Sequence, residues 1–200
     1  MTWIRTISYE DAKGKLRKLY DRIKAPNGQI DQIMLAHSLR PHSMEGHMSL
    51  YKHALHHSGN QLPKWLLEAL GVFVSHLNQC AYCFDHHFHG MKRLLKDDQR
   101  ADSIREAILS EKLATAFSEP EVGLLDYAAR LTKTPQAMEE QHVIRLRQLG
   151  WDDGAILEAN QVVAYFAYAN RTVLGLGVNS KGEVLGLSPR EGDEHTWSHG

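Results

Sequence analysis

The sequence predicts an all-α protein, a single-domain helical bundle with a Cys-X-X-Cys helical hairpin at its core. Three observations favour this fold class. Apolar residues recur at helical spacing along most of the chain, capping residues and prolines stand where helices should begin, and no stretch alternates convincingly between apolar and polar residues. The pattern fits about eight helices joined by short turns, which is typical of a bundle.

The composition limits the class of protein. The chain has 200 residues, of which 42% are hydrophobic, and this suits one globular domain with a sizeable core. The formal net charge is −1, so nothing indicates binding to nucleic acid or to an anionic membrane. The amino terminus lacks the apolar core of a signal peptide, so we expect a cytoplasmic protein, where a Cys-X-X-Cys pair is more often redox-active or metal-bound than structural.

The first part of the chain should form helices without catalytic residues. We expect residues 1–30 to be a lead-in and one peripheral helix, which Ser8 and Asp11 begin as a capping-box-like pair. Residues 31–175 are predicted to form the main helical domain, in which Asp31 caps a short helix and Pro41 opens a longer one. Its early histidines are expected to be partly exposed helix residues or, as a lesser role, to line the approach to the cysteines from a neighbouring helix: His37, His42, His47, His53, His56 and His57.

The centre of the predicted fold is the segment from Trp65 to Gly90. Its first part, up to Leu77, is too long and too evenly apolar for a strand, so we interpret it as a buried helix. Asn78 can adopt the left-handed conformation that ends a helix, and a second helix is expected to begin at about Gln79. The two helices would form an antiparallel hairpin.

The helices after the hairpin are predicted from residues that cap or open helices. The expected starts are Asp102 or Ser103, Ser118, Thr134 and Asp152. The last long helix should end near residue 174. Beyond it the helical spacing of apolar residues ends, so residues 176–200 are predicted to be a tail. Three apolar side chains of this tail could dock on a neighbouring subunit: Leu185, Leu187 and Trp197.

Four residues of the hairpin are candidates for a catalytic site: Glu68, Cys80, Cys83 and His87. Glu68 and His87 flank the turn at nearly equal separation, so at a rise of about 1.5 Å per residue they should lie at the same height. Cys80, Cys83 and His87 follow i, i+3, i+7 spacing and share one helix face. A carboxylate, an imidazole and two thiols would therefore line one seam.

These residue types suit redox or acid–base chemistry. Cysteine attacks as the thiolate, which the N–H groups and dipole of a helix N-terminus favour. A nearby histidine can take the thiol proton, and a carboxylate behind the histidine orients its ring. A second cysteine can resolve the sulfenic acid or mixed disulfide that the first one forms.

Two other interpretations of the cysteine pair stay open. Zinc would need two further ligands, for which His86, His87 and His89 are the nearest candidates, although positions on one straight helix rarely surround an ion. Alternatively, both cysteines are inert core residues. That interpretation leaves the acid Glu68 in an apolar helix unexplained. His53 and His57 also stand at a spacing that can hold a metal, but no acidic or cysteine ligand accompanies them.

The same residues carry a resemblance to a known family. Glu68, followed by Cys-Ala-Tyr-Cys and His87 within VSHLNQCAYCFDHH, is similar to the signature of the alkylhydroperoxidase D-like (AhpD-like) proteins of the carboxymuconolactone decarboxylase superfamily. The length and helical pattern resemble its peroxidase-related branch. The resemblance implies an all-helical subunit that forms a homo-oligomer, a trimer or a hexamer. It also implies Cys83 as the attacking thiol, Cys80 as its disulfide partner, and Glu68 and His87 as a proton relay. Tyr82 stands where the best-studied type has a second relay histidine.

The function that we predict is that of a thiol-dependent alkylhydroperoxide reductase or disulfide oxidoreductase. Its expected partners are a small-molecule hydroperoxide and a thiol reductant, with no cofactor, metal, nucleic acid or membrane. Two alternatives remain. One is an acid–base enzyme like carboxymuconolactone decarboxylase, since relatives in that superfamily work without the cysteines, and the other is a non-enzymatic redox sensor.

Overall fold

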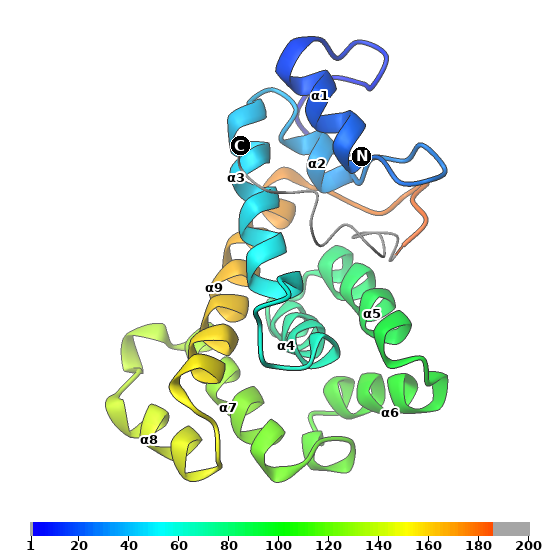
Figure 1. Ribbon diagram of the computed structural model, residues 1–200. Helices are drawn as coiled ribbons and strands as arrows, with labels where there is room; N and C mark the ends of the chain where they lie inside the picture. Colours follow the sequence, from blue (N-terminus) through cyan, green and yellow to red (C-terminus); the bar gives the residue numbers. More distant parts are fainter. Residues whose placement is uncertain (1, 186–200) are drawn as a thin grey trace.

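The computed structural model describes residues 2–185, which form nine α-helices and no strand (Figure 1). This confirms the predicted all-α class. The helices are α1 Gly14–Ile23, α2 Gln32–Ala36, α3 Pro41–Tyr51, α4 Lys64–Leu77, α5 Ala81–Leu95, α6 Asp98–Leu109, α7 Glu119–Lys133, α8 Glu140–Gln148 and α9 Asp153–Leu176. A π-helical turn, Lys52–His56, extends α3, and two short 3₁₀ turns occupy Leu113–Thr115 and Pro135–Ala137. None of the described helices combines the length and apolar composition needed to cross a bilayer.

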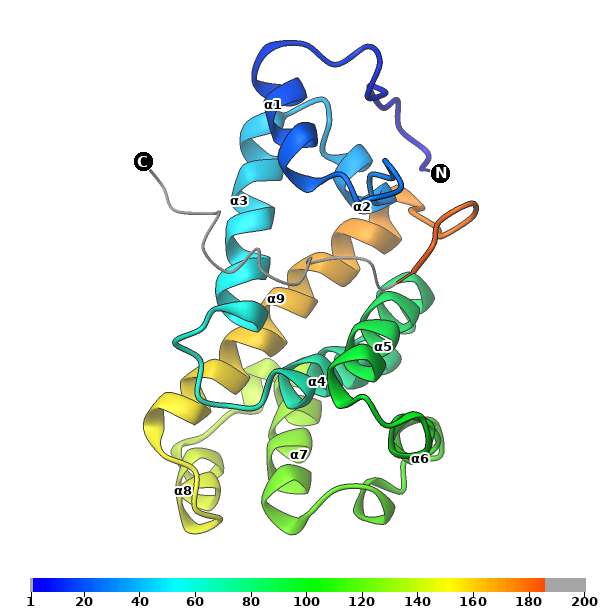
Figure 2. The same cartoon turned by 45° about the vertical axis from the view of Figure 1, so that its right-hand side comes forward.

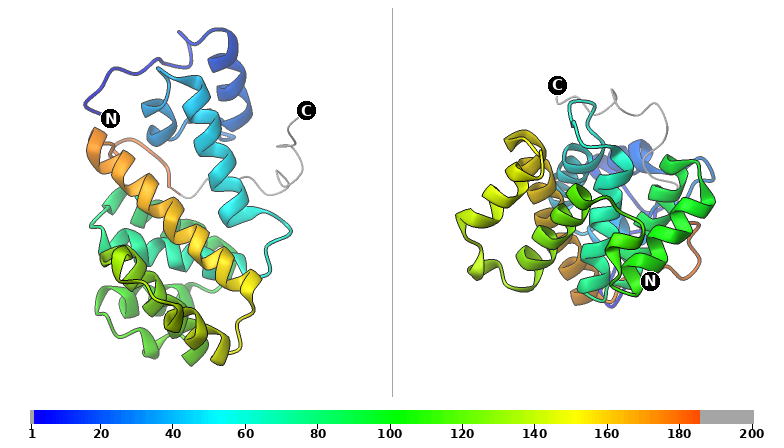
Figure 3. Two further views of the ribbon diagram at one scale, coloured as in Figure 1. Left: turned by 90° about the vertical axis from the view of Figure 1, so that its left-hand side faces the viewer. Right: turned by 90° about the horizontal axis from the view of Figure 1, so that it is seen from below.

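Helix α4 lies at the centre of the molecule, as its apolar sequence predicts. Every residue from Leu66 to Ser75 is buried, because α5, α7 and α9 pack around it (Figures 1 and 2). The long helix α9 runs past α4 and α7 along one side of the molecule (Figure 3). Helix α1 packs on α3 at the far end, around a second and smaller apolar cluster that includes Leu16, Tyr20 and Met44. The division at residues 30 and 175 stays a prediction.

The turn between α4 and α5 differs by one residue from the prediction. Asn78 keeps a helical conformation, with φ of −85°, and the left-handed residue is Gln79, with φ of 55°. Two backbone hydrogen bonds close the turn, from Gln79 N–H to the His76 carbonyl (2.9 Å) and from Cys80 N–H to the Ser75 carbonyl (2.9 Å). This is the Schellman pattern. It places Cys80 immediately before the first residue of α5 rather than inside the helix.

Several helix starts follow the predicted caps. Pro41 opens α3, Ser118 and Glu121 form the capping box of α7, and Asp152 accepts a hydrogen bond from Ala155 N–H (2.8 Å) at the start of α9. Ser118 and Asp152 accept hydrogen bonds from N–H groups that have no partner inside the first helical turn. Pro41 has no N–H, and the first turn of a helix does not need one there. These three predictions are confirmed.

Three other predicted starts are wrong. Ser8 and Asp11 do hydrogen-bond (3.0 Å), but they close a turn before α1, which begins at Gly14. Helix α6 begins at Asp98 and not at Asp102 or Ser103. The Asp97 side chain caps it by accepting a hydrogen bond from the Arg100 N–H (3.0 Å). Thr134 precedes a 3₁₀ turn at residues 135–137 rather than α8 itself. Helix α8 begins at Glu140, and Glu139 and His142 form its capping box.

The segment after α9 is ordered against the body of the protein as far as the structure describes it. Gly177, with φ of 63°, ends α9. Val184 then forms two hydrogen bonds with the side chain of Gln29, at 2.8 and 3.0 Å. Of the apolar residues expected to dock the tail, Leu185 is partly buried, whereas Leu187 and Trp197 lie outside the described residues.

Gly71 offers a test of the packing at the centre. A Cβ at this position would collide with the ring of Phe166, which lies against α4 and packs edge-on against His87 with ring centroids 4.5 Å apart. We expect Gly71→Ala to lower the free energy of unfolding by about 1–3 kcal/mol through overpacking. Gly46→Ala is the control, since open space surrounds Gly46 on α3, and it should be neutral or stabilise by about 0.5–1 kcal/mol. Urea unfolding measures both, and equal effects would contradict this account.

Candidate active site

The hairpin brings Glu68 and His87 together. His87 Nδ1 lies 2.6 Å from Glu68 Oε2, across the interface between α4 and α5. Glu68 is 1% exposed. A carboxylate only accepts hydrogen bonds, so the Nδ1 of His87 carries the hydrogen and its Nε2 is left as a basic lone pair. The geometry is therefore that of an imidazole oriented by a buried carboxylate.

The two cysteines lie beside each other at the start of α5. Both are reduced and buried, and their thiols are within hydrogen-bonding reach of one another and of the Asn170 side chain on α9. Asn170 is fixed in turn by the side chains of Asn78 (2.9 Å) and Ser75 (3.1 Å). The turn, α5 and α9 together hold the pair.

The two thiols differ in their acidity. The hydrogen bond from the Cys83 thiol lowers the pKa of Cys80 below its usual value, and the backbone N–H of Cys83 acts in the same direction. The pKa of Cys83 is raised well above its usual value, first by that same interaction with Cys80 and then by burial. In the reduced pair, the first negative charge therefore forms on Cys80.

Cys83 and His87 line one small cavity. Its volume is about 60 Å³, and it is closed by His47, Tyr51 and Tyr165 among other residues. A cavity of this size and polarity accommodates a water molecule, or the oxygens of a small substrate. Cys80 is not among the residues that line this cavity. Access from the cavity therefore leads to Cys83.

Glu68 is ionised in spite of its burial. Burial alone would raise the pKa of its carboxyl, but the nearby imidazoles of His87 and His56 outweigh burial and lower that pKa to about 2. Tyr51 and Tyr165 face the same cluster. The pKa of each is raised well above its usual value, mainly by burial, so both hydroxyls stay neutral.

The expectation for the early histidines is wrong for three of them. His37, His47 and His56 are buried, whereas His42, His53 and His57 are exposed. His56 Nε2 lies 3.2 Å from Glu68 Oε1, so it is a site residue that the sequence did not indicate. His47 lines the cavity, and burial lowers its pKa to about 3, so its ring is neutral. The i, i+4 pair His53 and His57 stacks on the surface.

Tyr82 and His86 hold the segment after α9. The Tyr82 hydroxyl accepts a hydrogen bond from Ile33 N–H (3.2 Å) and donates one to Glu183 Oε1 (3.2 Å). His86 Nε2 lies 3.4 Å from Glu183 Oε2. The Glu183 side chain is 1% exposed. Tyr82 thus anchors the tail rather than serving as packing alone.

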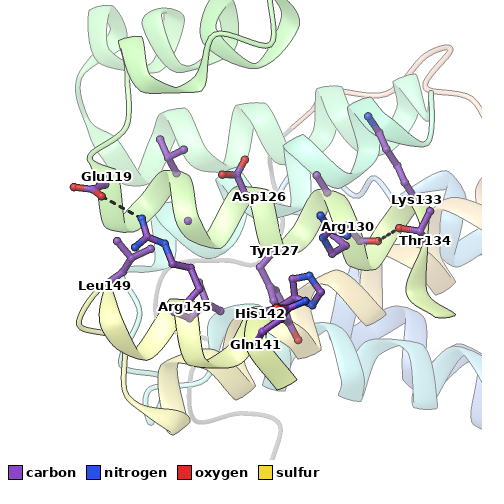
Figure 4. A pocket seen from close by; sticks show the side chains of 14 residues that line it. Glu119, Asp126, Tyr127, Arg130, Lys133, Thr134, Gln141, His142, Arg145 and Leu149 are labelled. Atoms are coloured by element: carbon purple, nitrogen blue, oxygen red, sulfur yellow. Dashed lines mark hydrogen bonds and ion pairs between the residues drawn. The ribbon is translucent and has the colours of Figure 1, made fainter. Parts of the chain in front are cut away.

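A second concavity lies far from the cysteines. It is an open groove of about 760 Å³ between α7 and α8, with the side chains of Tyr127, Arg130, His142 and Arg145 along it (Figure 4). Burial raises the pKa of Asp126 in its wall. The groove contains none of the four predicted catalytic residues, so size does not mark the reactive centre here.

The buried carboxylate makes stability depend on pH in a defined window. The pKa of Glu68 falls from 4.5 to about 2 on folding, so its ionised form contributes stability above pH 4.5 that is lost as the pH falls toward 2. We expect a loss on the order of 3 kcal/mol across this window, and a smaller one in Glu68→Gln. Urea unfolding at pH 5 and pH 2.5 measures both. Glu106→Gln, on the exposed face of α6, is the control and should behave as the wild type. Equal pH dependence in all three proteins would contradict the assignment.

Fold and site together define a class: an AhpD-like helical fold with a Cys-X-X-Cys pair and a histidine–carboxylate pair on one hairpin. No protein-family model and no curated protein sequence matches the chain. Solved structures do match it.

The chain is similar to an AhpD-core, peroxidase-related protein from Ralstonia eutropha JMP134, with a TM-score of 0.79, 20% identity and coverage of 94% of this chain and 98% of that one. It is also similar to a peroxidase-related protein from Silicibacter sp. TM1040 (TM-score 0.73, 21% identity, coverage of 90% and 92%). A third similar structure is the debrominase Bmp8 (TM-score 0.69, 18% identity, coverage of 87% and 89%). These likenesses confirm the fold that the sequence resemblance implied.

Proposed function

We propose that the protein is a thiol-dependent oxidoreductase that reduces a hydroperoxide through a dithiol–disulfide cycle at Cys80 and Cys83. One observation carries the proposal: Cys83 and His87 line the same cavity, with Cys80 against one and Glu68 against the other. Nucleophile, resolving thiol, base and orienting carboxylate are thus within one seam. The likeness to peroxidase-related structures supports the same class of activity.

The cycle balances with these groups. The Cys83 thiolate attacks one peroxide oxygen; an S–O bond forms, the O–O bond breaks, and the leaving oxygen takes a proton from the His87 imidazolium. Cys80 then attacks the sulfenic sulfur of Cys83, which gives the disulfide and releases water. An external thiol reductant returns the two electrons. Glu68 stabilises the imidazolium between proton uptake and proton release.

Access rather than resting charge selects the attacking thiol. The first charge of the reduced pair forms on Cys80, yet the cavity reaches Cys83. The Cys83 thiol can give its proton to the Cys80 thiolate, or to His87 through the cavity. Either transfer generates the Cys83 thiolate beside the cavity, where the substrate can reach it. Cys80 remains in contact with Cys83, in place to form the disulfide.

The two cysteines should therefore respond differently to substitution. Cys83→Ser should abolish peroxide consumption, whereas Cys80→Ser should permit one turnover and leave a sulfenic acid on Cys83. Intact mass and a sulfenic-acid-trapping reagent, after one equivalent of an organic hydroperoxide, measure this. The wild type should lose both free thiols and two hydrogens. A sulfenic acid trapped on Cys80 in Cys83→Ser would reverse the assignment.

Further assays separate the alternatives. Activity on a lactone or carboxylate substrate that survives loss of both thiols would favour an acid–base enzyme. Slow peroxide reaction with an oxidation-dependent change of assembly would favour a redox sensor. One Bmp8 structure, of a cysteine-to-alanine variant, holds 2,3,4-tribromopyrrole. We would test the same compound with this protein. Bromide release that depends on Cys83 would favour dehalogenation over peroxide reduction.

We also propose that the chain forms a homo-oligomer of three or more subunits. Leu157 and Tyr168 are 57% and 40% exposed and lie about three turns apart on one outward face of α9. Exposed large apolar side chains on one surface are typical of subunit interfaces. Light scattering at micromolar concentration should give a mass of at least three chains, and Leu157→Glu should lower it. A monomer mass for the wild type would refute the proposal.

A further inference from the structure

His56 touches the centre of the candidate site from an unexpected element. Its Nε2 lies 3.2 Å from Glu68 Oε1, and the residue is 7% exposed. His87 holds the other carboxylate oxygen, Oε2, at 2.6 Å. The buried carboxylate is thus held between two imidazoles, one on each oxygen. His56 comes from the turn after α3 and His87 from α5.

We propose that His56 is a positioning residue: it holds the Glu68 carboxylate in the orientation from which Glu68 directs His87 toward the cavity. The inference deepens the proposed thiol chemistry and rests on it, since His87 is the group that exchanges the proton with Cys83 and the leaving oxygen. His56 itself lies outside the lining of the cavity and acts through Glu68.

The hydrogen positions support this role. A carboxylate only accepts, so hydrogens on the His56 Nε2 and the His87 Nδ1 serve its two oxygens. The Nε2–H of His56 is shared between Glu68 Oε1 at 3.2 Å and the Tyr51 hydroxyl at 3.0 Å. Each oxygen of Glu68 then has a charge-assisted donor. Without His56, Oε1 would lose this donor in a site that excludes solvent. The carboxylate would then be free to turn away from His87 or to take up a proton.

The backbone after α3 is shaped to deliver His56. In an α-helix, residues five apart point about 140° away from each other around the axis. The π-helical turn at Lys52–His56 brings them nearly into line, because its hydrogen bonds run from i to i+5. The Tyr51 hydroxyl accordingly lies 3.0 Å from His56 Nε2, with the two rings 4.9 Å apart. His53, in the same turn, points to the surface.

The opposite wall of the site leaves room for the carboxylate. A Cβ at Gly90 on α5 would lie 3.3 Å from Glu68 Oε1, closer than most side-chain contacts. Oε1 therefore fits between Gly90 and His56. The π-helical turn that carries His56 and the missing side chain of Gly90 together place Glu68 Oε1 against His56.

Three substitutions test the role. His56→Leu removes the donor, and we expect peroxide consumption to fall about 10- to 100-fold. His56→Gln should recover most of the rate, because its amide N–H can reach the carboxylate where the imidazole Nε2–H does. His53→Gln is the matched control: its ring bonds the Ser49 carbonyl (2.7 Å) on the surface, and the rate should be unchanged. A rate for His56→Leu equal to the wild type would overturn the proposal.

Two further measurements separate positioning from mere packing. In a Glu68→Gln background, His56→Leu should have little additional effect on the rate, and full additivity would contradict action through Glu68. Carbon-13 NMR of the Glu68 carboxyl as a function of pH should show a higher midpoint in His56→Leu than in the wild type or His53→Gln. The titration needs no peroxide. A wild type that consumes no peroxide would refute the proposed function, but the titration midpoint of Glu68 would still decide the role of His56. Equal midpoints in His56→Leu and the wild type would reject that role.

Discussion

The buried carboxylate of Glu68 is the constraint on which the site depends. An acid among the apolar side chains of α4 is tolerated because its ionised form has partners on both oxygens. Those partners are His87 and His56, so one buried charge fixes the relative placement of α4, α5 and the turn after α3. The charge also determines the tautomer of His87, whose free nitrogen is the base in the proposed thiol chemistry. Stability and reactivity therefore share one interaction.

The turn between the hairpin helices makes the two cysteines unequal. The Cys80 N–H closes the Schellman turn on Ser75, and its carbonyl accepts from Phe84 N–H (3.0 Å) at the start of α5. Its sulfur consequently meets the backbone N–H of Cys83 in the first helical turn, which favours a negative charge on Cys80. Cys83 stands one turn further along, where it reaches the cavity. One thiol is placed for charge and the other for access.

The seam could be predicted from the sequence because it follows from regular helix geometry. Fixed rise and periodicity place Glu68 and His87 at one height, and both cysteines on one face, once the hairpin is recognised. The sequence favours Asn78 as the left-handed residue, because asparagine tolerates that conformation. In the structure the Asn78 side chain binds Asn170, and the left-handed residue is Gln79. His56 could not be predicted, because α-helical periodicity does not apply in a π-turn. The contact of Tyr82 with Glu183 joins residues 101 positions apart, which no local pattern indicates.

Burial disfavours a negative charge in both halves of the site, and imidazole partners outweigh it only at Glu68. Around Glu68, exclusion of water strengthens the attraction between carboxylate and imidazoles. Around Cys83, the hydrogen bond with Cys80 and then burial raise the pKa of the thiol, so the cysteine that lines the cavity is protonated at rest. Cys80 and His87 are the two groups placed to take that proton, one by direct contact and the other across the cavity. A thiol that is held neutral until a base accepts its proton is protected from adventitious oxidation, since the thiolate is the reactive form. In the proposed thiol chemistry, the histidine–carboxylate cluster is therefore what makes a buried Cys-X-X-Cys pair usable.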